Sequence, residues 1–356
     1  MAIDTTISSG NKPSRLLFIS VPRTASNLLL KILDIHHQPN VLTNRRGGYF
    51  FFEAFMTAAR DGHLNKPFEQ WSETEKTKVH DAFQQCLNSL EDYSAQAQRD
   101  NKIMFAKEHA FWFINPAVLN SQSDDLPSAS GDMFNTFRLS LPDTYGPEQT
   151  FSENNQTLLP DQYLLTWQFA FLIRHPALAW PSMYRAMIRM SKLGFLDDDG
   201  VKGASVTNMT LKWTRKLFDW CLGQPGEPVE PLVIDAHDII HNPGAVLRFC
   251  EAAGLDTNAI QFVWGGENDE KKAENFVSSD PSESKDMHQA SARIMLSTLE
   301  ASKGIVKDKA PAAVDIDIEA EKWRAEFGDE VAGIIEKAVW DAMPDYEYLR
   351  ERRVQG

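Results

Sequence analysis

Short apolar runs alternate along the chain with longer amphipathic stretches. The runs predict buried strands, because each is apolar and flanked by polar residues; they are Leu16–Ser20, Lys102–Ala106, Gln168–Arg174 and Pro231–Asp235. The amphipathic stretches predict helices over residues 27–36, 71–99, 181–193, 207–221 and 243–254, and an acidic surface helix over 317–341. Strands that alternate with helices predict an α/β protein with a central parallel sheet flanked by helices.

Two regions depart from this alternation. Residues 1–14 are polar and predict a disordered tail. Residues 120–160 are rich in Ser, Asp, Asn, Gln, Pro and Gly and show little periodicity, which is typical of a functional loop or a disordered segment. We interpret them as an insertion that forms a lid. No linker forces a boundary elsewhere, so we expect one α/β domain over residues 15–356.

Composition narrows the class of partner. The formal net charge of −14 disfavours nucleic acid and anionic membranes, because both are bound by clustered Lys and Arg. A local group of arginines can still bind a small anion. The chain contains no signal-peptide core and no run near ~18 apolar residues, so we expect a cytoplasmic protein. Its expected partner is a small-molecule acceptor, and a homodimer is left open.

The cysteines give no sign of a metal site or a disulfide framework. Cys86, Cys221 and Cys250 are widely spaced and form no Cys-x-x-Cys pair. We expect three reduced thiols and no bound metal.

The first candidate site follows the first strand. Residues 16–31 form an apolar run that breaks at Pro22-Arg23 and restarts as a helix. Thr24, Ser26 and Asn27 add polar side chains to the backbone amides of this turn, and Arg23 adds a forked cation suited to phosphate or sulfate. The Walker A pattern is absent, which disfavours a P-loop kinase. An ordinary helix cap is the alternative.

The second candidate site lies about 150 residues further on. Arg174 directly follows the apolar run Phe169–Ile173, Ser182 comes eight residues later at an expected helix start, and Arg185 lies one turn beyond. Surface salt bridges are the alternative for these arginines. We favour a site, because an unpaired charge at the end of a buried run would be costly.

These segments together resemble the sulfotransferases that use 3′-phosphoadenosine 5′-phosphosulfate. Pro22–Asn27 stands where that family has Pro-[Lys/Arg]-Ser-Gly-Thr-[Thr/Ser]. Arg174-His175-Pro176 with Ser182 matches its Arg-x-Pro motif and the Ser eight residues after the Arg. Lys107-Glu108-His109 matches its Lys-x-His, and Leu232–Gly254 resembles its later strand, acidic turn and helix. The similarity spans residues 16–255.

The resemblance implies a P-loop-like sulfotransferase architecture and a specific mechanism. His109 is the implied general base for the acceptor hydroxyl, while Lys107 and Arg23 stabilise charge on the transferring group. The donor 3′-phosphoadenosine 5′-phosphosulfate is the implied co-substrate, and the scheme needs no metal. The residues implied to bind the donor are Arg23, Thr24, Ala25, Ser26 and Asn27 at the 5′ end, and Arg174 and Ser182 at the 3′-phosphate.

The chain also departs from the family pattern. Ala25 replaces a Gly, Asn27 replaces a hydroxyl residue, and Leu28 stands where many members have Trp. The Gly-rich C-terminal donor motif is reduced to Lys303-Gly304 with Lys307 and Lys309. Two alternatives therefore stay open: an enzyme of this fold that uses His109 for elimination or hydrolysis, and a non-catalytic nucleotide-binding protein.

The acceptor is suggested by aromatic residues near the Lys-x-His motif. They are Tyr49, Phe50, Phe51, Phe52 and Phe55, with Phe111, Trp112 and Phe113 directly after His109. They predict an apolar pocket for a small hydrophobic alcohol or phenol. Packing in the core is the alternative for most of them.

Overall fold

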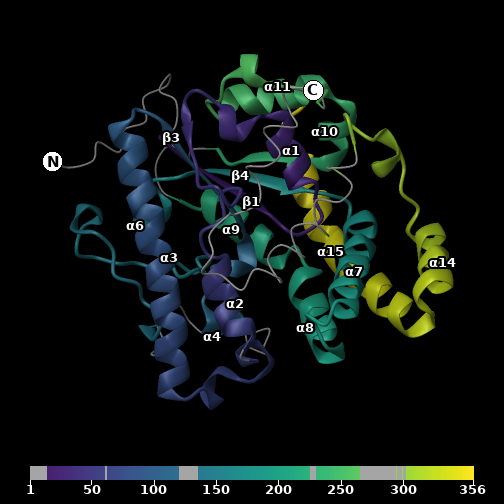
Figure 1. Ribbon diagram of the computed structural model, residues 1–356, viewed down its shortest axis with the longest axis horizontal. Helices are drawn as coiled ribbons and strands as arrows, with labels where there is room; N and C mark the ends of the chain where they lie inside the picture. The colour runs from purple at the N-terminus through teal and green to yellow at the C-terminus, as the bar shows by residue number, and fades with distance from the viewer. Residues whose placement is uncertain are drawn as a thin grey trace. The chain divides into compact units, whose positions relative to one another are not determined.

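The computed structural model describes residues 14–60, 62–119, 135–224, 230–264, 294, 299 and 302–356. Its sheet has five strands in the order β2-β3-β1-β4-β5, of which Figure 1 labels β1, β3 and β4. The strands are β1 Arg15–Ser20, β2 Val41–Leu42, β3 Ile103–His109, β4 Gln168–Ile173 and β5 Leu232–Asp235. Their pairing confirms the expected α/β fold, since β1 pairs in parallel with β4 and β2 with β3.

The strands at the centre of the sheet are buried along their whole length. Every residue of β1, β3 and β4 is buried, as their continuous apolar sequences require. In the β1–β4 pair Leu16 lies opposite Gln168 and Ile19 opposite Phe171. The two strands therefore end at the same level, and the turns that follow them begin side by side.

Contacts between residues divide the chain into two compact units. Unit 1 consists of residues 1–19, 40–171 and 213–231, and unit 2 of residues 20–39, 172–212 and 232–356. The boundaries fall near the carboxyl ends of β1 and β4. Both candidate anion-binding turns therefore belong to unit 2, while Lys107-Glu108-His109 belongs to unit 1.

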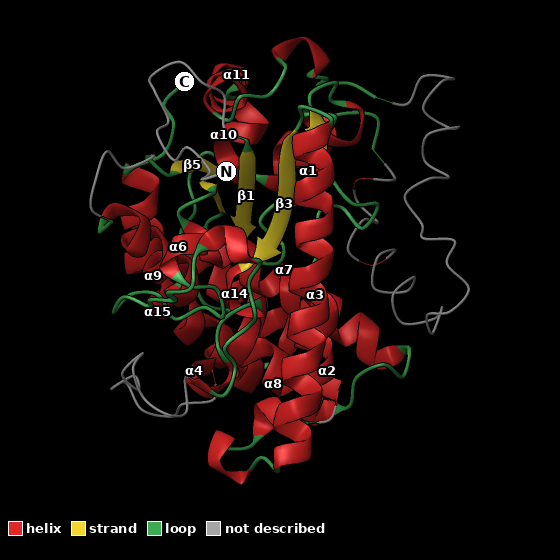
Figure 2. Ribbon diagram, turned by 90° about the vertical axis from the view of Figure 1, so that its left-hand side faces the viewer, coloured by secondary structure: helices red, strands yellow, loops and turns green. Residues whose placement is uncertain are grey.

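Unit 1 is built around β3 and one long helix. Its helices are α2 Phe52–Arg60, α3 Glu73–Arg99, α4 Pro116–Leu119, α6 Asp161–Leu164 and α9 Lys212–Leu222. A capping box between Ser72 and Glu75 starts α3. The apolar face of α3, which includes Val79 and Leu87, packs against β3 and α2, and Figure 2 shows α3 beside β3.

Unit 2 carries most of the remaining helices. They are α1 Ser26–Ile32, α7 Pro176–Lys192, α8 Asp198–Asn208, α10 Ala236–His241, α11 Pro243–Ala252, α14 Ile316–Phe327 and α15 Asp329–Glu351. Helix α7 packs against α8 and α15, and the indole of its Trp180 donates to the Ala338 carbonyl at 3.3 Å. Short 3₁₀ turns in the two units cover Ile35–His37, His63–Asn65, Phe68–Gln70, Ala110–Trp112, Asp143–Tyr145, Thr257–Ala259 and Lys307–Lys309.

Three expected helix boundaries were wrong. Helix α7 begins at Pro176 rather than near Pro181, because Pro176 fits the first helical position and the His175 side chain caps the Ala177 N–H. The helix expected over 207–221 is two helices, since α9 restarts at Lys212, whose N–H is accepted by the Thr210 hydroxyl. The helix expected over 317–341 breaks at Gly328, which has a φ of 82°.

Two expected segments fall partly outside the described residues. In the expected tail 1–14, only Ser14 belongs to the described residues. In the expected insertion 120–160, residues 120–134 lie outside them. The described part of the insertion, residues 135–160, buries Phe137, Leu158 and Leu159. Closure of this segment as a lid stays a prediction. Among the described residues, no helix combines the length and apolar character needed to cross a membrane.

Candidate active site

The turn after β1 holds two residues in a left-handed conformation. Arg23 has a φ of 67° and Ala25 a φ of 71°. Left-handed residues alternating along a turn aim successive backbone N–H groups at one point, which is a common anion-binding geometry. A left-handed alanine costs about 1–2 kcal/mol, which explains why glycine suits this position. Strain of this kind is typical of functional sites.

The polar side chains of the turn differ in their roles. The Thr24 hydroxyl is fully buried and donates to the Val21 carbonyl at 2.7 Å, so it closes the turn. An anion would therefore meet the main-chain N–H of Thr24 rather than its hydroxyl proton. Ser26 is buried and Asn27 is half-buried at the start of α1.

The structure brings the two predicted anion-binding segments into direct contact within unit 2. The Arg23 Nε donates to the Ser182 hydroxyl at 3.0 Å, and the Arg174 guanidinium donates to the Arg23 carbonyl at 2.8 Å. Arg174 also donates to the Lys309 carbonyl at 2.8 Å, which places residues 307–309 beside the same group. Three predicted donor-site residues thus form one cluster, although they lie far apart in the sequence.

This cluster concentrates positive charge. Burial and the nearby Arg189 lower the pKa of Arg23. Burial and Arg23 lower the pKa of Arg174 to about 10, although Asp235 acts in the opposite direction. A bound anion would relieve this repulsion between guanidinium groups. Arg189 was not among the expected site residues, although it lies two helical turns after Ser182 and therefore on the same face of the expected helix.

Arg185 does not belong to this cluster. Its guanidinium forms a two-bond ion pair with Glu326, with N···O distances of 2.7 and 2.6 Å, at a half-exposed position. For Arg185 the alternative of a surface salt bridge is therefore correct.

The Lys-Glu-His motif of unit 1 forms the last three residues of β3. Lys107 is fully buried, and its N–H donates to the Gly48 carbonyl at 2.9 Å. Glu108 is buried and one carboxylate oxygen accepts from the Phe50 and Phe51 N–H groups, at 2.6 and 3.0 Å. The Nε2 of His109, a residue 5% exposed, lies 3.3 Å from the Tyr49 hydroxyl.

Burial shifts the pKa values of both charged residues toward neutral pH. It lowers the pKa of Lys107 to about 7, although Glu108 acts in the opposite direction. It raises the pKa of Glu108 to about 8, although the bonds from Phe50 and Phe51 and the Lys107 charge counteract it. Both side chains can therefore change charge near neutral pH, which is common at active sites.

Four of the predicted aromatic residues, Trp112 among them, form a cluster beside His109. Trp112 packs edge-on against His109 at 4.3 Å between ring centroids, and it contacts Tyr49 at 4.7 Å and Phe52 at 4.8 Å. Phe55 lies 6.2 Å from Trp112. Tyr49, Phe52 and Phe55 are half-buried and can meet a ligand. The other predicted aromatics are buried in the core; they are Phe50, Phe51, Phe111 and Phe113.

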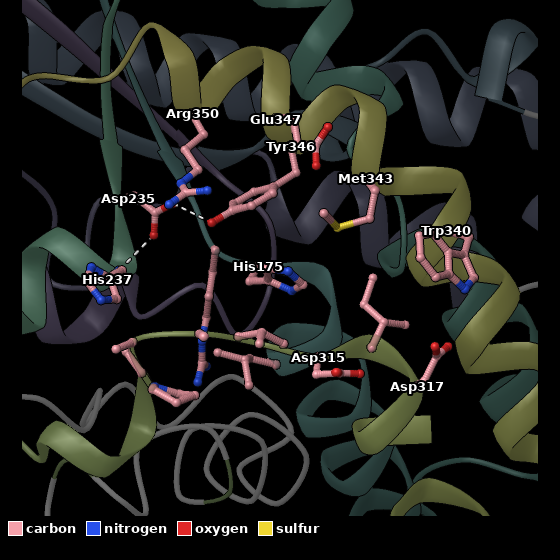
Figure 3. Close-up of a pocket in the computed structure, with 18 residues that line it drawn as sticks. His175, Asp235, His237, Asp315, Asp317, Trp340, Met343, Tyr346, Glu347 and Arg350 are labelled. Atoms are coloured by element: carbon pink, nitrogen blue, oxygen red, sulfur yellow. Dashed lines mark hydrogen bonds between the residues drawn. The ribbon is translucent and has the colours of Figure 1, made fainter. Parts of the chain in front are cut away.

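A separate cavity of about 550 Å³ lies in unit 2 against Arg174. Figure 3 shows Tyr346 and Arg350 of α15 reaching toward Asp235, which accepts from the Tyr346 hydroxyl at 2.8 Å. Burial and Arg350 lower the pKa of the His175 in its wall to about 4, so this imidazole is neutral at pH 7. The other carboxylates that line the cavity are Asp315, Asp317 and Glu347. With more carboxylates than guanidiniums, the cavity is poorly suited to a phosphate group.

Fold and site together define an α/β protein with a candidate anion-binding turn at the carboxyl end of β1. No protein-family model matches the chain. It is 36% identical over 361 residues to the sulfotransferase ppzF of Metarhizium majus, covering 97% of this chain and 98% of the relative. It is 35% identical to the sulfotransferase ppzF of Metarhizium rileyi, covering 97% of both. The chain therefore belongs to the sulfotransferase family.

Solved structures give weaker similarities. The sulfotransferase domain of the Synechococcus PCC 7002 olefin synthase matches with a TM-score of 0.38 and 17% identity, over 89% of this chain and 97% of that domain. The sulfotransferase domain from the curacin biosynthetic pathway matches with a TM-score of 0.36 and 13% identity, over 88% and 97% of the two chains.

Proposed function

We propose that the protein transfers a sulfuryl group from 3′-phosphoadenosine 5′-phosphosulfate to the hydroxyl of a small hydrophobic or phenolic metabolite. Its expected partner is this small acceptor, and the expected compartment is the cytoplasm. One observation carries the proposal: Arg23 bonds to Ser182 and accepts from Arg174 at a strained turn, where burial and the neighbouring guanidinium lower the pKa of each arginine.

The cluster suits a nucleotide with phosphates at both ends. The Arg23 guanidinium and the N–H groups of residues 24–27 would hold the 5′-phosphosulfate. Arg174 and Ser182 would hold the 3′-phosphate. A guanidinium has more N–H groups than the two that Arg174 gives to carbonyls, so Arg174 keeps donors for a phosphate. Lys307 and Lys309 lie on the segment that Arg174 contacts and can add charge.

The motif in unit 1 supplies the acid–base chemistry. The donor provides the sulfuryl group, which leaves its 5′-phosphate oxygen as the acceptor oxygen bonds to sulfur. His109 takes the proton from the acceptor hydroxyl, a role that suits an imidazole near neutral pH. Lys107 in its ammonium form stabilises negative charge on the transferring group. The half-buried rings of Tyr49, Phe52 and Phe55 favour an aromatic or apolar acceptor.

Calorimetric titration with 3′-phosphoadenosine 5′-phosphate tests the donor site, with adenosine 5′-phosphate as the control ligand. We expect binding that depends on the 3′-phosphate. Arg174→Ala should weaken the affinity for 3′-phosphoadenosine 5′-phosphate about 10- to 100-fold, because a charge-assisted hydrogen bond is worth about 1.5–3 kcal/mol. The affinity for adenosine 5′-phosphate should change little.

Arg185→Ala is the matched control, since it removes a nearby arginine of α7 that is paired with Glu326. It should leave both affinities unchanged. Equal loss for both ligands in Arg174→Ala would remove Arg174 from the 3′-phosphate site. Failure of the wild-type protein to bind either ligand would favour elimination or hydrolysis on a different metabolite.

A further inference from the structure

Each residue of the Lys-Glu-His motif contacts the loop that carries Tyr49. Lys107 donates its N–H to the Gly48 carbonyl, and its ammonium nitrogen lies 4.5 Å from the centre of the Tyr49 ring. Glu108 accepts from two N–H groups directly after Tyr49. His109 contacts the Tyr49 hydroxyl. The end of β3 and residues 44–51 thus form one bonded assembly inside unit 1.

The loop itself is shaped to present Tyr49. The Asn44 side chain accepts from the Gly48 N–H at 3.0 Å and donates to the Tyr49 carbonyl at 2.7 Å. Gly48 has a φ of 93°, and a Cβ there would lie 3.0 Å from the main-chain nitrogen of Lys107. Because the loop backbone is fixed on both sides of Tyr49, the tyrosine ring has little freedom to leave His109.

Burying Glu108 to hold this loop costs free energy of folding. Its carboxylate is buried, and the oxygen that does not bind Phe50 and Phe51 is buried without a hydrogen-bond partner. A buried carboxylate is destabilising unless its bonds compensate, and an apolar residue of similar volume is often no worse for stability. Stability therefore does not explain the presence of a glutamate here. Its position does, because its two hydrogen bonds fix the backbone next to Tyr49.

Tyr49 acts on the part of His109 that matters for proton transfer. A neutral imidazole has one donor and one acceptor nitrogen, and the partner of one nitrogen fixes the tautomer and the ring plane. The Tyr49 hydroxyl is the partner of Nε2, at 3.3 Å, and because a hydroxyl can donate or accept it holds the ring plane in either tautomer. Trp112 packs against both rings, so the phenol and the imidazole are held in a fixed relation.

We propose that Tyr49 and Glu108 are a positioning pair for His109: the Tyr49 hydroxyl orients the imidazole through Nε2, and the Glu108 carboxylate fixes Tyr49 by binding the backbone that follows it. This inference rests on the proposed role of His109 as general base. It adds two residues to the reaction, one of them in the middle position of the Lys-x-His motif.

The first test observes His109 without turnover. The ring nitrogen signals of the full-length protein are recorded by NMR with labelled histidine, and His109 is assigned by the signal lost in His109→Gln. Tyr49→Phe keeps the ring but removes the hydroxyl, and Glu108→Leu keeps the volume but removes the acceptor. Both should change the pH dependence and tautomer pattern of the His109 signals.

Two variants serve as controls. Glu108→Gln retains an oxygen that can accept from Phe50 and Phe51, so it should restore the wild-type His109 signals. Tyr93→Phe removes a hydroxyl from a tyrosine that packs edge-on against Phe50, and it should leave His109 unchanged. Wild-type His109 signals in Tyr49→Phe would overturn the proposal for Tyr49, and wild-type signals in Glu108→Leu would overturn it for Glu108.

The second test uses the transfer assay. Tyr49→Phe and Glu108→Leu should lower kcat about tenfold, the equivalent of one hydrogen bond, with KM for the acceptor within about twofold. Glu108→Gln should restore kcat. A wild-type kcat in Tyr49→Phe would contradict the positioning role. If the wild-type protein transfers no sulfuryl group, the proposed function fails, and the NMR experiment still decides whether the pair orients His109.

Discussion

Gly48 is the position where one added methyl group tests the assembly around the Lys-Glu-His motif. Its φ of 93° is left-handed, and an alanine there costs about 1–2 kcal/mol in backbone conformation. The added Cβ would also lie 3.0 Å from the main-chain nitrogen of Lys107, 3.1 Å from the Cβ of Lys107 and 3.2 Å from a ring carbon of Phe105. These atoms belong to β3 and cannot move cheaply, so overpacking adds about 1–3 kcal/mol. We expect Gly48→Ala to lose about 2–5 kcal/mol of unfolding free energy.

Gly47→Ala is the matched control for this substitution. Gly47 also has a left-handed φ, 71°, but a Cβ there meets nothing within 4 Å. It should lose only the conformational part, about 1 kcal/mol. Urea unfolding followed by tryptophan fluorescence measures both variants, and the difference between them measures the contact with β3. Equal losses would refute the close packing of Gly48 on Lys107.

Three further perturbations address the turn, the buried glutamate and the core of unit 1. Ala25→Gly relieves a left-handed alanine and should change the unfolding free energy by between 0 and about +1 kcal/mol in urea; a loss above about 1 kcal/mol would contradict the strain. Because the pKa of Glu108 rises from 4.5 to about 8, its folded-state carboxyl holds a proton that the unfolded chain releases, and the contribution of Glu108 to stability falls as pH rises through this window. Glu108→Gln should remove this pH dependence. Its urea midpoint, measured relative to that of the wild-type protein, should therefore rise from pH 5 to pH 9, and a difference in midpoint that stays constant with pH would count against the raised pKa of Glu108. Glu91→Gln weakens the ion pair to buried Arg15, at 2.7 Å, and should lower stability by about 2–4 kcal/mol in thermal unfolding, whereas a loss below about 1 kcal/mol would show that the pair contributes little.

The sequence was sufficient for features that depend on local pattern. Continuous apolar runs identified β1, β3, β4 and β5, because a strand that is buried on both faces has an apolar residue at nearly every position. The break at Pro22-Arg23 identified the turn after β1. Parallel pairing then brings Arg23 and Arg174 together, which follows from topology once both strands are known.

Other features depend on contacts between distant residues and left no local signal. The bond between Tyr49 and His109 joins positions 60 residues apart. Glu108 occupies the variable position of the Lys-x-His motif, and nothing in the local sequence indicates that its carboxylate would bind the backbone of another loop. Arg189 gave no signal of its own, because its link to the site is its charge near Arg23, a residue of a distant segment.

Sulfuryl transfer with His109 as the base is tested by a direct transfer assay. The purified protein is mixed with sulfur-labelled 3′-phosphoadenosine 5′-phosphosulfate and a panel of small phenols and hydrophobic alcohols, and labelled products are counted. We expect label in at least one phenol with the wild-type protein, the same rate with Arg185→Ala, and a loss of at least about 100-fold with His109→Gln. Full transfer by His109→Gln would contradict the proposed base, and no transfer to any acceptor despite donor binding would contradict the proposed reaction.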